Sequence, residues 1–139
     1  MPPVPKTLIC LALLLSARLA RAGEGMESPA DLQFRYAEGL YRDGLRKLAI
    51  TELEKFLQAN PQDPRRGRGQ FYLGECKRAG DDLKGALAAY EAAAQDPALP
   101  ERSLSIYRIG DCRFRLGDLK GAVPPLREFL AGQLASPDH

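Results

Sequence analysis

The pentapeptide Asp-Leu-Lys-Gly-Ala occurs at residues 82–86 and again, unchanged, at residues 118–122, an offset of 36 residues. A second shared motif precedes each copy: Leu-Gly-Glu-Cys at 73–76 and Ile-Gly-Asp-Cys at 109–112. In both cases the glycine of this motif lies twelve residues before the alanine that ends the pentapeptide. A more diverged copy precedes both, with Tyr-Ala-Glu-Gly at 36–39 placed in the same way before a later alanine. Two landmarks that keep a constant spacing indicate one structural unit repeated three times.

Each unit is predicted to form two α-helices. In the first unit, Leu32, Tyr36 and Leu40 recur every four residues, which is the spacing of an apolar stripe along one helix. A second stripe follows and contains six apolar side chains: Leu45, Leu48, Ile50, Leu53, Phe56 and Leu57. Carried over to the other units, this pattern predicts an all-α chain with helices at about 29–43, 46–59, 65–79, 82–95, 100–116 and 119–134.

Prolines mark where several helices should begin. Ser28–Pro29 and Asp63–Pro64 each place a capping oxygen before a proline, which is favoured at the first helical position. Pro100–Glu101 should open the third unit in the same way. Pro124 and Pro125 instead fall inside the last predicted helix, where their missing backbone donors should delay or bend its first turns.

Gly74 and Gly110 lie in the middle of predicted helices, where glycine costs about 1 kcal/mol relative to alanine. Close approach of the paired helix, which would carry Ala86 or Ala122 opposite, would offset this cost. Ala37 and Ala49 would play the same parts in the first unit. Larger apolar residues would then fill the space between helix pairs: Tyr36, Leu73 and Ile109 from the first helices, and Leu53, Tyr90 and Leu126 from the second.

The first 22 residues have the layout of a secretory signal peptide. Lys6 precedes an apolar run over residues 7–17, and Ala20, Arg21 and Ala22 form a small-residue cleavage site. The run is shorter than the about 20 residues that span a bilayer. We therefore expect an exported product, periplasmic or secreted, with no integral membrane segment after cleavage. The alternative is a leader that is retained as an anchor.

Removal of this leader takes away Lys6, Arg18 and Arg21, which lowers the number of Lys and Arg residues from 20 to 17 against 18 Asp and Glu. A net charge of −1 disfavours a nucleic-acid partner, and the basic run at 65–68 is too short to reverse that expectation. The chain has one histidine, His139, and no catalytic or metal-ligand spacing stands out. The sequence therefore predicts a protein that is not an enzyme and that has no cofactor.

Three features of the repeated unit are shared with a known family of helical repeats. A bulky apolar residue precedes a small one in the first helix, a Gly/Asp turn follows, and a small alanine comes early in the second helix. These positions are Leu73–Gly74 and Ile109–Gly110, Gly80–Asp81 and Gly117–Asp118, and Ala49, Ala86 and Ala122. The chain therefore resembles the tetratricopeptide repeat (TPR) family.

The resemblance implies helix-turn-helix repeats at about 30–64, 65–99 and 100–134, stacked as a short right-handed α-solenoid. Residues 23–29 would be a linker and 135–139 a C-terminal tail. Lys77 and Arg113 depart from the family, which often has tyrosine there, and the repeat exceeds the usual 34 residues. A longer repeat behind an export signal is similar to bacterial envelope members of the family, such as the Tol-Pal-associated coordinator.

In the TPR family, the first helices of successive repeats line a concave face that binds peptides or partner proteins. Residues that follow this register are Phe34, Phe71 and Tyr107, then Glu38, Glu75 and Asp111, with Tyr41 and Phe114 one turn later. Alternating aromatic and acidic rows would favour a ligand with apolar and basic side chains. The alternative is that the aromatic residues form the core between repeats and the acids a solvated edge.

The last predicted helix, 119–134, has no further repeat to cover it. Its apolar residues are Val123, Leu126, Phe129, Leu130 and Leu134. An exposed apolar patch usually marks a contact with another chain, so a homo-oligomer or a docked partner protein is expected here. The alternative is that Pro124 and Pro125 fold the tail back over its own repeat.

Cys76 and Cys112 occupy equivalent places one repeat apart. Packed helices lie about 8–10 Å apart, beyond the roughly 7 Å limit for the Cα atoms of a disulfide. We therefore expect two small buried side chains, with a disulfide as the alternative that an oxidising compartment would permit.

Overall fold

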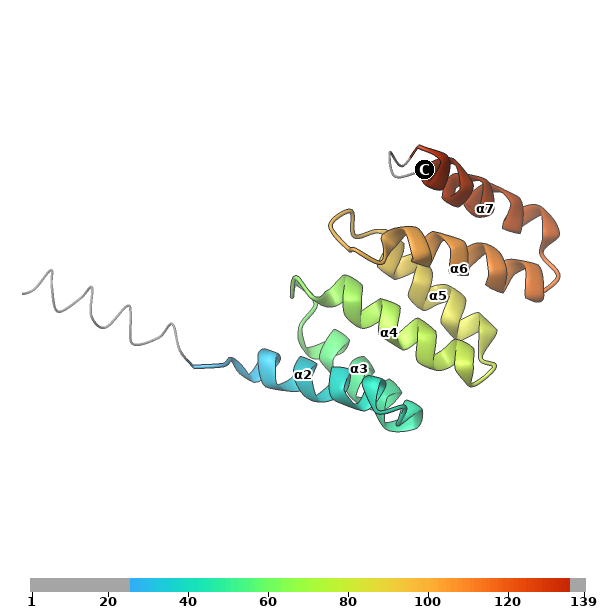
Figure 1. The fold of residues 1–139 in the computed structure, drawn as a ribbon. Coiled ribbons are helices and arrows are strands. Elements are labelled where there is room, and N and C mark those ends of the chain that lie inside the picture. Colours follow the sequence, from blue (N-terminus) through green and yellow to red (C-terminus); the bar gives the residue numbers. More distant parts are fainter. Residues whose placement is uncertain (1–25, 136–139) are drawn as a thin grey trace, which may run out of the picture.

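The computed structural model describes residues 26–135. Within this range the chain forms no strand and six α-helices: α2 (Pro29–Arg42), α3 (Arg46–Ala59), α4 (Arg66–Ala79), α5 (Leu83–Ala94), α6 (Arg102–Arg115) and α7 (Leu119–Leu134). They form three helix-turn-helix pairs stacked along one direction (Figure 1). The prediction of an all-α chain of three stacked helical repeats is confirmed. The predicted leader at 1–22 and residues 136–139 of the predicted tail lie outside the described residues.

Between Met26 and Ala135, no helix combines the length and the apolar character that crossing a bilayer requires.

The core is distributed along the stack. Each helix packs against the next one in the chain, and α2 also contacts α4. Buried side chains form two apolar clusters, one joining the first and second repeats and one joining the second and third. Their large members are Phe34, Leu53, Phe56 and Leu73 in the first cluster, and Phe71, Tyr90, Leu99 and Ile109 in the second. Each repeat therefore depends on its neighbour to bury its apolar face.

The two mid-helix glycines make room for bulky residues of the paired helix. A Cβ atom at Gly74 would lie 2.7 Å from the ring of Tyr90, and one at Gly110 would lie 2.5 Å from Leu126. The predicted close approach is therefore present. The side chain opposite each glycine is not Ala86 or Ala122, however, but the large residue four positions later, because one turn of helix carries that residue over the gap.

The turn within each pair uses the same backbone conformation three times. Gly44, Asp81 and Gly117 hold equivalent positions and have positive φ angles of 73°, 61° and 85°. Glycine adopts this conformation without the penalty that a Cβ atom imposes. The equivalent of Gly117 is thus Asp81 and not Gly80, which corrects the alignment of the two turns by one residue.

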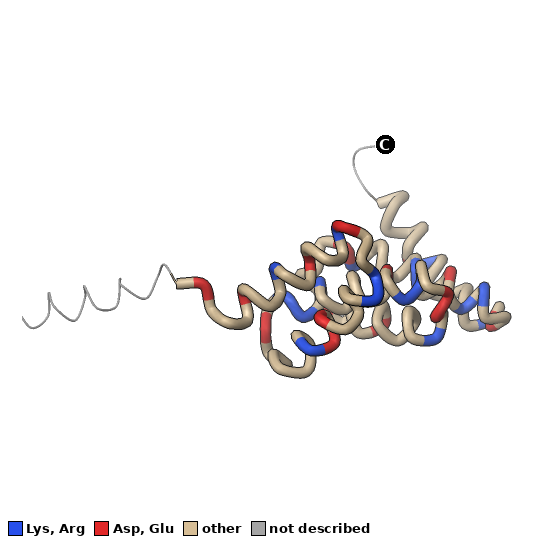
Figure 2. Tube along the Cα trace, turned by 90° about the horizontal axis from the view of Figure 1, so that it is seen from below, with Lys and Arg blue, Asp and Glu red and all other residues tan. Residues whose placement is uncertain are grey.

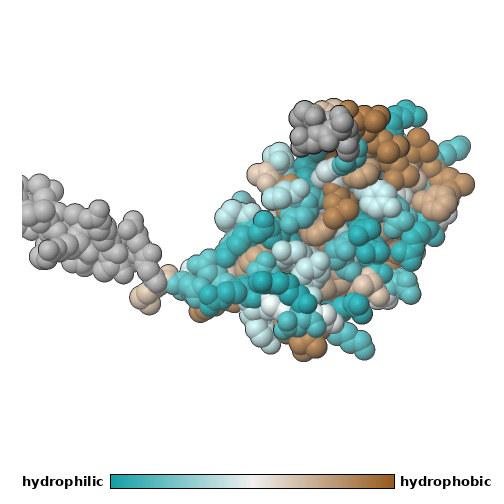
Figure 3. Space-filling model, viewed as in Figure 1, coloured by the Kyte–Doolittle hydropathy of each residue, from teal (hydrophilic) through white to brown (hydrophobic). Residues whose placement is uncertain are grey.

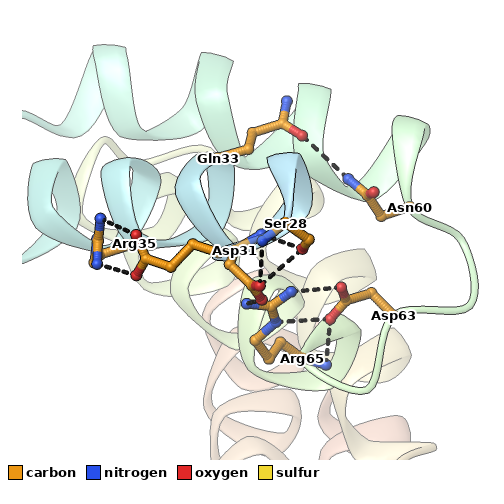
Figure 4. Close-up of polar contacts among 8 residues, drawn as sticks. Ser28, Asp31, Gln33, Arg35, Asn60, Asp63 and Arg65 are labelled. Atoms are coloured by element: carbon orange, nitrogen blue, oxygen red, sulfur yellow. Dashed lines mark hydrogen bonds and ion pairs between the residues drawn. The ribbon is translucent and has the colours of Figure 1, made fainter. Parts of the chain in front are cut away.

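Of the three helix starts predicted from a proline, only that of the first repeat has the predicted cap. Ser28 and Asp31 form a reciprocal capping box with Pro29 at the start of α2. Asp63 was expected to cap the second repeat in the same way, but α4 begins at Arg66 and has no side-chain cap. The Asp63 carboxylate instead accepts hydrogen bonds from the backbone N and the guanidinium of Arg65, each at 2.8 Å (Figure 4).

The third repeat departs from the predicted start as well. Pro100 and Glu101 precede α6, which begins at Arg102 and also lacks a side-chain cap. The second helices are capped more regularly. Asp82 and Asp118 each accept a hydrogen bond of 2.9 Å from the backbone N–H three residues later. The repeated pentapeptide therefore encodes a helix start.

Pro124 and Pro125 do not delay the start of α7, which runs from Leu119 through both prolines to Leu134. A proline cannot donate to the carbonyl four residues before it. For Pro125 that carbonyl belongs to Gly121, and Arg113 supplies the missing donor through Nη1 at 3.0 Å. The side chain of a neighbouring helix thus replaces a backbone hydrogen bond.

The apolar stripe predicted for the first helix is confirmed at Leu40 but is wrong at Leu32 and Tyr36. α2 buries Phe34, Ala37 and Leu40, whereas Leu32 and Tyr36 are exposed. The equivalents of Leu32 and Tyr36 in the second repeat are Gly69 and Leu73, which pack against the first repeat. The exposed side of α2 is therefore the side by which a repeat contacts the one before it.

Candidate interaction surfaces

The predicted acidic row lies along α2, α4 and α6, and its first two members connect neighbouring repeats. Tyr72 donates a hydrogen bond from its hydroxyl to Glu38 at 3.1 Å. Arg108 donates from Nε to Glu75 at 2.9 Å. In both cases the donor lies on the first helix of the next repeat. Glu38 and Glu75 therefore hold the stack together, and they are not free to bind a ligand.

Glu75 is the most densely bonded carboxylate of this row. In addition to the hydrogen bond from Arg108, it accepts one of 2.6 Å from the hydroxyl of Tyr90 and one of 3.3 Å from the guanidinium of Arg78. Burial alone would raise the pKa of Glu75, but the hydrogen bond from Tyr90 and the charges of Arg108 and Arg78 hold that pKa below its usual value. The carboxylate is thus kept ionised.

Tyrosine hydroxyls that donate to these carboxylates are correspondingly hard to ionise. Burial, together with the hydrogen bond to Glu38, raises the pKa of Tyr72 to about 12. Burial and the bond to Glu75 raise the pKa of Tyr90 further. Both hydroxyls therefore remain donors at physiological pH, and neither suits the role of a general base.

Phe34 and Phe71, predicted to contact a ligand, lie in the core. Both rings are buried, because their side of the helix faces the second helix and the following repeat. Tyr107, the third of this row, is half-buried against Phe129, with ring centroids 5.2 Å apart. The sequence left open whether these aromatic residues bind a ligand or form the core between repeats. Phe34 and Phe71 form part of the core.

The second predicted aromatic position does reach the surface. Tyr41 is partly exposed and stacks on Tyr72 of the next repeat, with ring centroids 4.3 Å apart and the planes inclined by 19°. Phe114 is its equivalent two repeats later and is 60% exposed. Beside Tyr41 lies a hollow of about 310 Å³ whose charged lining comprises Arg42, Arg46, Glu75 and Arg78.

Basic and acidic residues are interspersed along the described part of the Cα trace (Figure 2). The basic run at 65–68 follows this rule. Arg65 forms ion pairs with Asp31 and Asp63, both at 2.7 Å, and lies 5.2 Å from the ring centroid of Phe34 (Figure 4). This arginine links the first repeat to the second and is not free to bind a phosphate backbone.

The residues predicted for contact through α7 divide into two groups. Leu126 and Phe129 are partly buried, the first against Gly110 and the second against Tyr107. Val123, Leu130 and Leu134 are exposed. Figure 3 shows apolar surface gathered at the end of the stack where Figure 1 places α7.

Cys76 and Cys112 are buried free thiols in different core clusters. Burial raises the pKa of each thiol, which disfavours the reactive thiolate. Over residues 26–135, no three acidic, cysteine or histidine side chains come together as a metal-ion site.

Three residues that matter at these surfaces were missed in the sequence: Tyr72, Arg108 and Arg113. Tyr72 and Arg108 hold equivalent positions one repeat apart, and each lies 33 or 34 residues after the acid that it contacts. That recurrent spacing was the available signal. Arg113 was noted in the sequence as a departure from the tyrosine of the TPR pattern, but its contacts with Gly121 and Glu91 were not predicted.

The sequence matches no family profile and no curated protein. Solved structures do share the arrangement of the helices. The TPR-like repeats of a protein described as a kinesin light chain from Podosopora anserina superpose with a TM-score of 0.62 at 22% identity. The match covers 82% of this chain and 61% of that one, and a single-residue variant of the same protein gives equal values. The fold is a TPR-like helical repeat.

Proposed function

We propose that this protein is a non-enzymatic scaffold that binds a partner protein or peptide along the face formed by α2, α4 and α6. The observation that carries the proposal is the row of aromatic rings that stays at least partly exposed there. Its members are Tyr41, Tyr72 and Phe114. TPR-like repeats form extended surfaces of this kind, although the fold by itself does not fix the ligand.

The chemistry of the face favours apolar contact over charge attraction. Aromatic and arginine side chains dominate binding energy at protein interfaces. Here the acids of the first two repeats already have arginine or tyrosine donors, so Asp111 is the predicted acid without a side-chain partner among the described residues. A ligand with apolar side chains is therefore supported, and the expected preference for basic ligands is restricted to the end near Asp111.

Site-specific crosslinking in the source cells tests this proposal. A photoreactive phenylalanine analogue at Tyr41 should capture a protein other than this chain, because that ring lies on the proposed face. The same analogue at Lys84, an exposed residue of α5, is the matched control. The proposal requires a product specific to Tyr41 that Phe114→Ala weakens. Identical products at both positions, or none at Tyr41, would contradict it.

We further propose that the scaffold acts in the cell envelope, as do the TPR proteins that the sequence resembles. The support is the signal-peptide layout of residues 1–22. Intact-mass measurement of the protein from its cells tests this: a chain that begins near Gly23 is expected, and a chain that keeps Lys6 in a soluble cytoplasmic fraction would disprove export.

A second candidate function is that of a small assembly subunit that oligomerises through α7. The exposed side chains of Val123, Leu130 and Leu134 favour it, because they form an apolar end to the stack.

A further inference from the structure

The two ends of the stack carry complementary halves of the contact that joins one repeat to the next. At the α2 end, Tyr36 is 58% exposed. Its equivalents, Leu73 and Ile109, are 6% and 8% exposed because each packs on the repeat before it. Leu32, beside Tyr36, is also exposed. The outer side of α2 therefore has the residues of a repeat contact but no preceding repeat among the described residues.

At the other end, the outer side of α6 and α7 has the residues that receive such a contact. Leu130 is 59% exposed, whereas its equivalent Leu57 is 8% exposed because it is covered by the second repeat. Val123 is exposed as well, and its equivalents Ile50 and Leu87 are partly buried against the clusters between repeats. This outer side is thus apolar at the positions where a first helix would pack.

Polar groups at the two ends match in the same register. Within the stack, the donor row is Tyr72 and Arg108, and the acceptor row is Glu38 and Glu75. By the repeat offset, the residue of the first repeat equivalent to Tyr72 is Arg35, and the residue of the third repeat equivalent to Glu75 is Asp111. An arginine at one end therefore corresponds to a carboxylate at the other. Arg35 now pairs with Glu27 on the exposed surface.

The aromatic position repeats the pattern. Tyr41 is covered by Tyr72 of the following repeat, and Phe114 is the equivalent of Tyr41. A first helix placed after α6 would bring the equivalent of Tyr72, which is Arg35, over the ring of Phe114. A guanidinium over an aromatic face is a favourable contact, and it would cover a ring that is otherwise 60% exposed.

We propose that a second copy of this chain docks here, its α2 packed on the outer side of α6 and α7 of the first copy. Tyr36 and Leu32 of one copy contact Val123 and Leu130 of the other, and Arg35 reaches Asp111. The contact is head-to-tail, so it leaves one free end of each kind and extends into an open row of copies. It joins the two ends of the stack and does not rest on the partner proposed for the α2–α4–α6 face, but Asp111 and Phe114 belong to both surfaces, so a second copy and that partner would compete at α6.

Sedimentation velocity on the protein purified from cells tests the proposal through two blocked variants. Tyr36→Glu blocks the outer side of α2, and Leu130→Glu blocks the outer side of α6 and α7. Both positions are exposed, so circular dichroism should show unchanged helix content. The unmodified protein should form species that grow beyond a dimer as its concentration rises. Each variant alone should stay monomeric, and an equal mixture of the two should form a 1:1 dimer. Lys84→Glu, outside both surfaces, should associate like the unmodified protein.

Charge reversal tests the register. Arg35→Glu and Asp111→Arg should each lower the association constant by roughly fivefold, the scale of one exposed ion pair. The double variant should regain most of the loss. The proposal is overturned by a protein that stays monomeric at high concentration, by a closed dimer that Leu130→Glu abolishes and Tyr36→Glu does not affect, or by a mixture of blocked variants that stays monomeric.

Discussion

Gly74 and Glu75 are neighbours in α4, and each shows how one residue can decide a contact between helices. Because Gly74 has no side chain, the Tyr90 ring can approach its backbone closely. Glu75 provides a carboxylate that joins Tyr90 of the same repeat to Arg108 of the next. The first contact depends on shape and the second on charge, so they respond to different perturbations.

The substitution Gly74→Ala should destabilise the protein. Alanine has the better helix propensity by about 1 kcal/mol, but its Cβ atom would lie 2.7 Å from the Tyr90 ring, and such overpacking typically costs about 1–3 kcal/mol. Gly39→Ala is the control, because nothing lies within 4 Å of a Cβ atom there, and it should be neutral or stabilising. Urea unfolding followed by circular dichroism measures both. Equal stability of the two variants would disprove the close approach.

Glu75 should make stability depend on acid pH. The pKa of its carboxyl is lowered in the folded chain, so its contribution is present above the usual value of 4.5 and is lost as the pH falls below it. Glu75→Gln should lower the free energy of unfolding at pH 7 by about 2 kcal/mol. The difference between the two proteins should narrow below about pH 4.5. Thermal unfolding across pH 3–7 measures it, and a difference that stays constant with pH would contradict the ionised network.

At the scale of the element, α7 and the turns show where local sequence rules hold and where a neighbour overrides them. The α2 capping box follows from residues 28–31 alone. The continuity of α7 does not follow from its own residues alone, because Arg113 of α6 supplies a donor to the Gly121 carbonyl. The positive-φ position is glycine in two turns and aspartate in the third, so the second turn adopts a conformation that its residue does not favour.

Removal of the Arg113 side chain should destabilise α7. Arg113→Met leaves the Gly121 carbonyl without its donor and Glu91 without its ion pair, which we expect to lower the free energy of unfolding by about 2 kcal/mol. Pro125→Ala restores a backbone amide that can bond to that carbonyl. In the Pro125→Ala background the effect of Arg113→Met should therefore be smaller by roughly 1 kcal/mol. Strict additivity in this double-mutant cycle would show that Arg113 does not compensate for the proline.

Asp81→Gly should stabilise the second turn by about 0.5–1 kcal/mol, because Asp81 has a φ angle of 61° that glycine adopts without strain. The ion pair of Asp81 with Arg115 at 3.4 Å is exposed and contributes little. Asp81→Ala removes the same ion pair but keeps the Cβ atom, so it should not stabilise. Melting temperatures of the two variants measure the contrast, and a gain in Asp81→Ala would contradict the argument from φ.

The repeats and all six helices could be predicted from the sequence, because periodicity reports them directly. Which side of α2 is buried could not be predicted. Leu32 and Tyr36 hold the positions by which the second repeat contacts the first, and no repeat precedes them within the described residues. The same holds for the surfaces. Phe34 was indistinguishable from Tyr41 by register, and only the three-dimensional packing separates a buried ring from an exposed one. The charge network was missed because its partners lie 33 and 34 residues apart.

At the scale of the whole molecule, each repeat contacts only the repeats next to it in the stack. The middle repeat, α4 and α5, is covered on both sides, whereas α2 and α7 are each covered on one. Stability in such a protein is approximately a sum of repeat and interface contributions. Its ends should therefore open more often than its centre.

Native-state hydrogen exchange should reveal this gradient. The amides of α4 and α5 should exchange slowest, and those of α2 and α7 faster, because an end repeat opens by breaking one interface and the middle repeat by breaking two. Measurement at low protein concentration separates this effect from association. Uniform protection across all six helices would show that the chain unfolds as a single cooperative unit.

Burial of the Cys76 and Cys112 thiols affects how the chain can be made as well as how it is packed. Thiol–disulfide exchange requires an accessible thiolate, and both side chains lack that accessibility once the repeats have closed over them. Folding therefore needs neither an oxidant nor an isomerase at these two sites. The same covalent structure can form under reducing or oxidising conditions, so this part of the chain is compatible with either side of an export barrier.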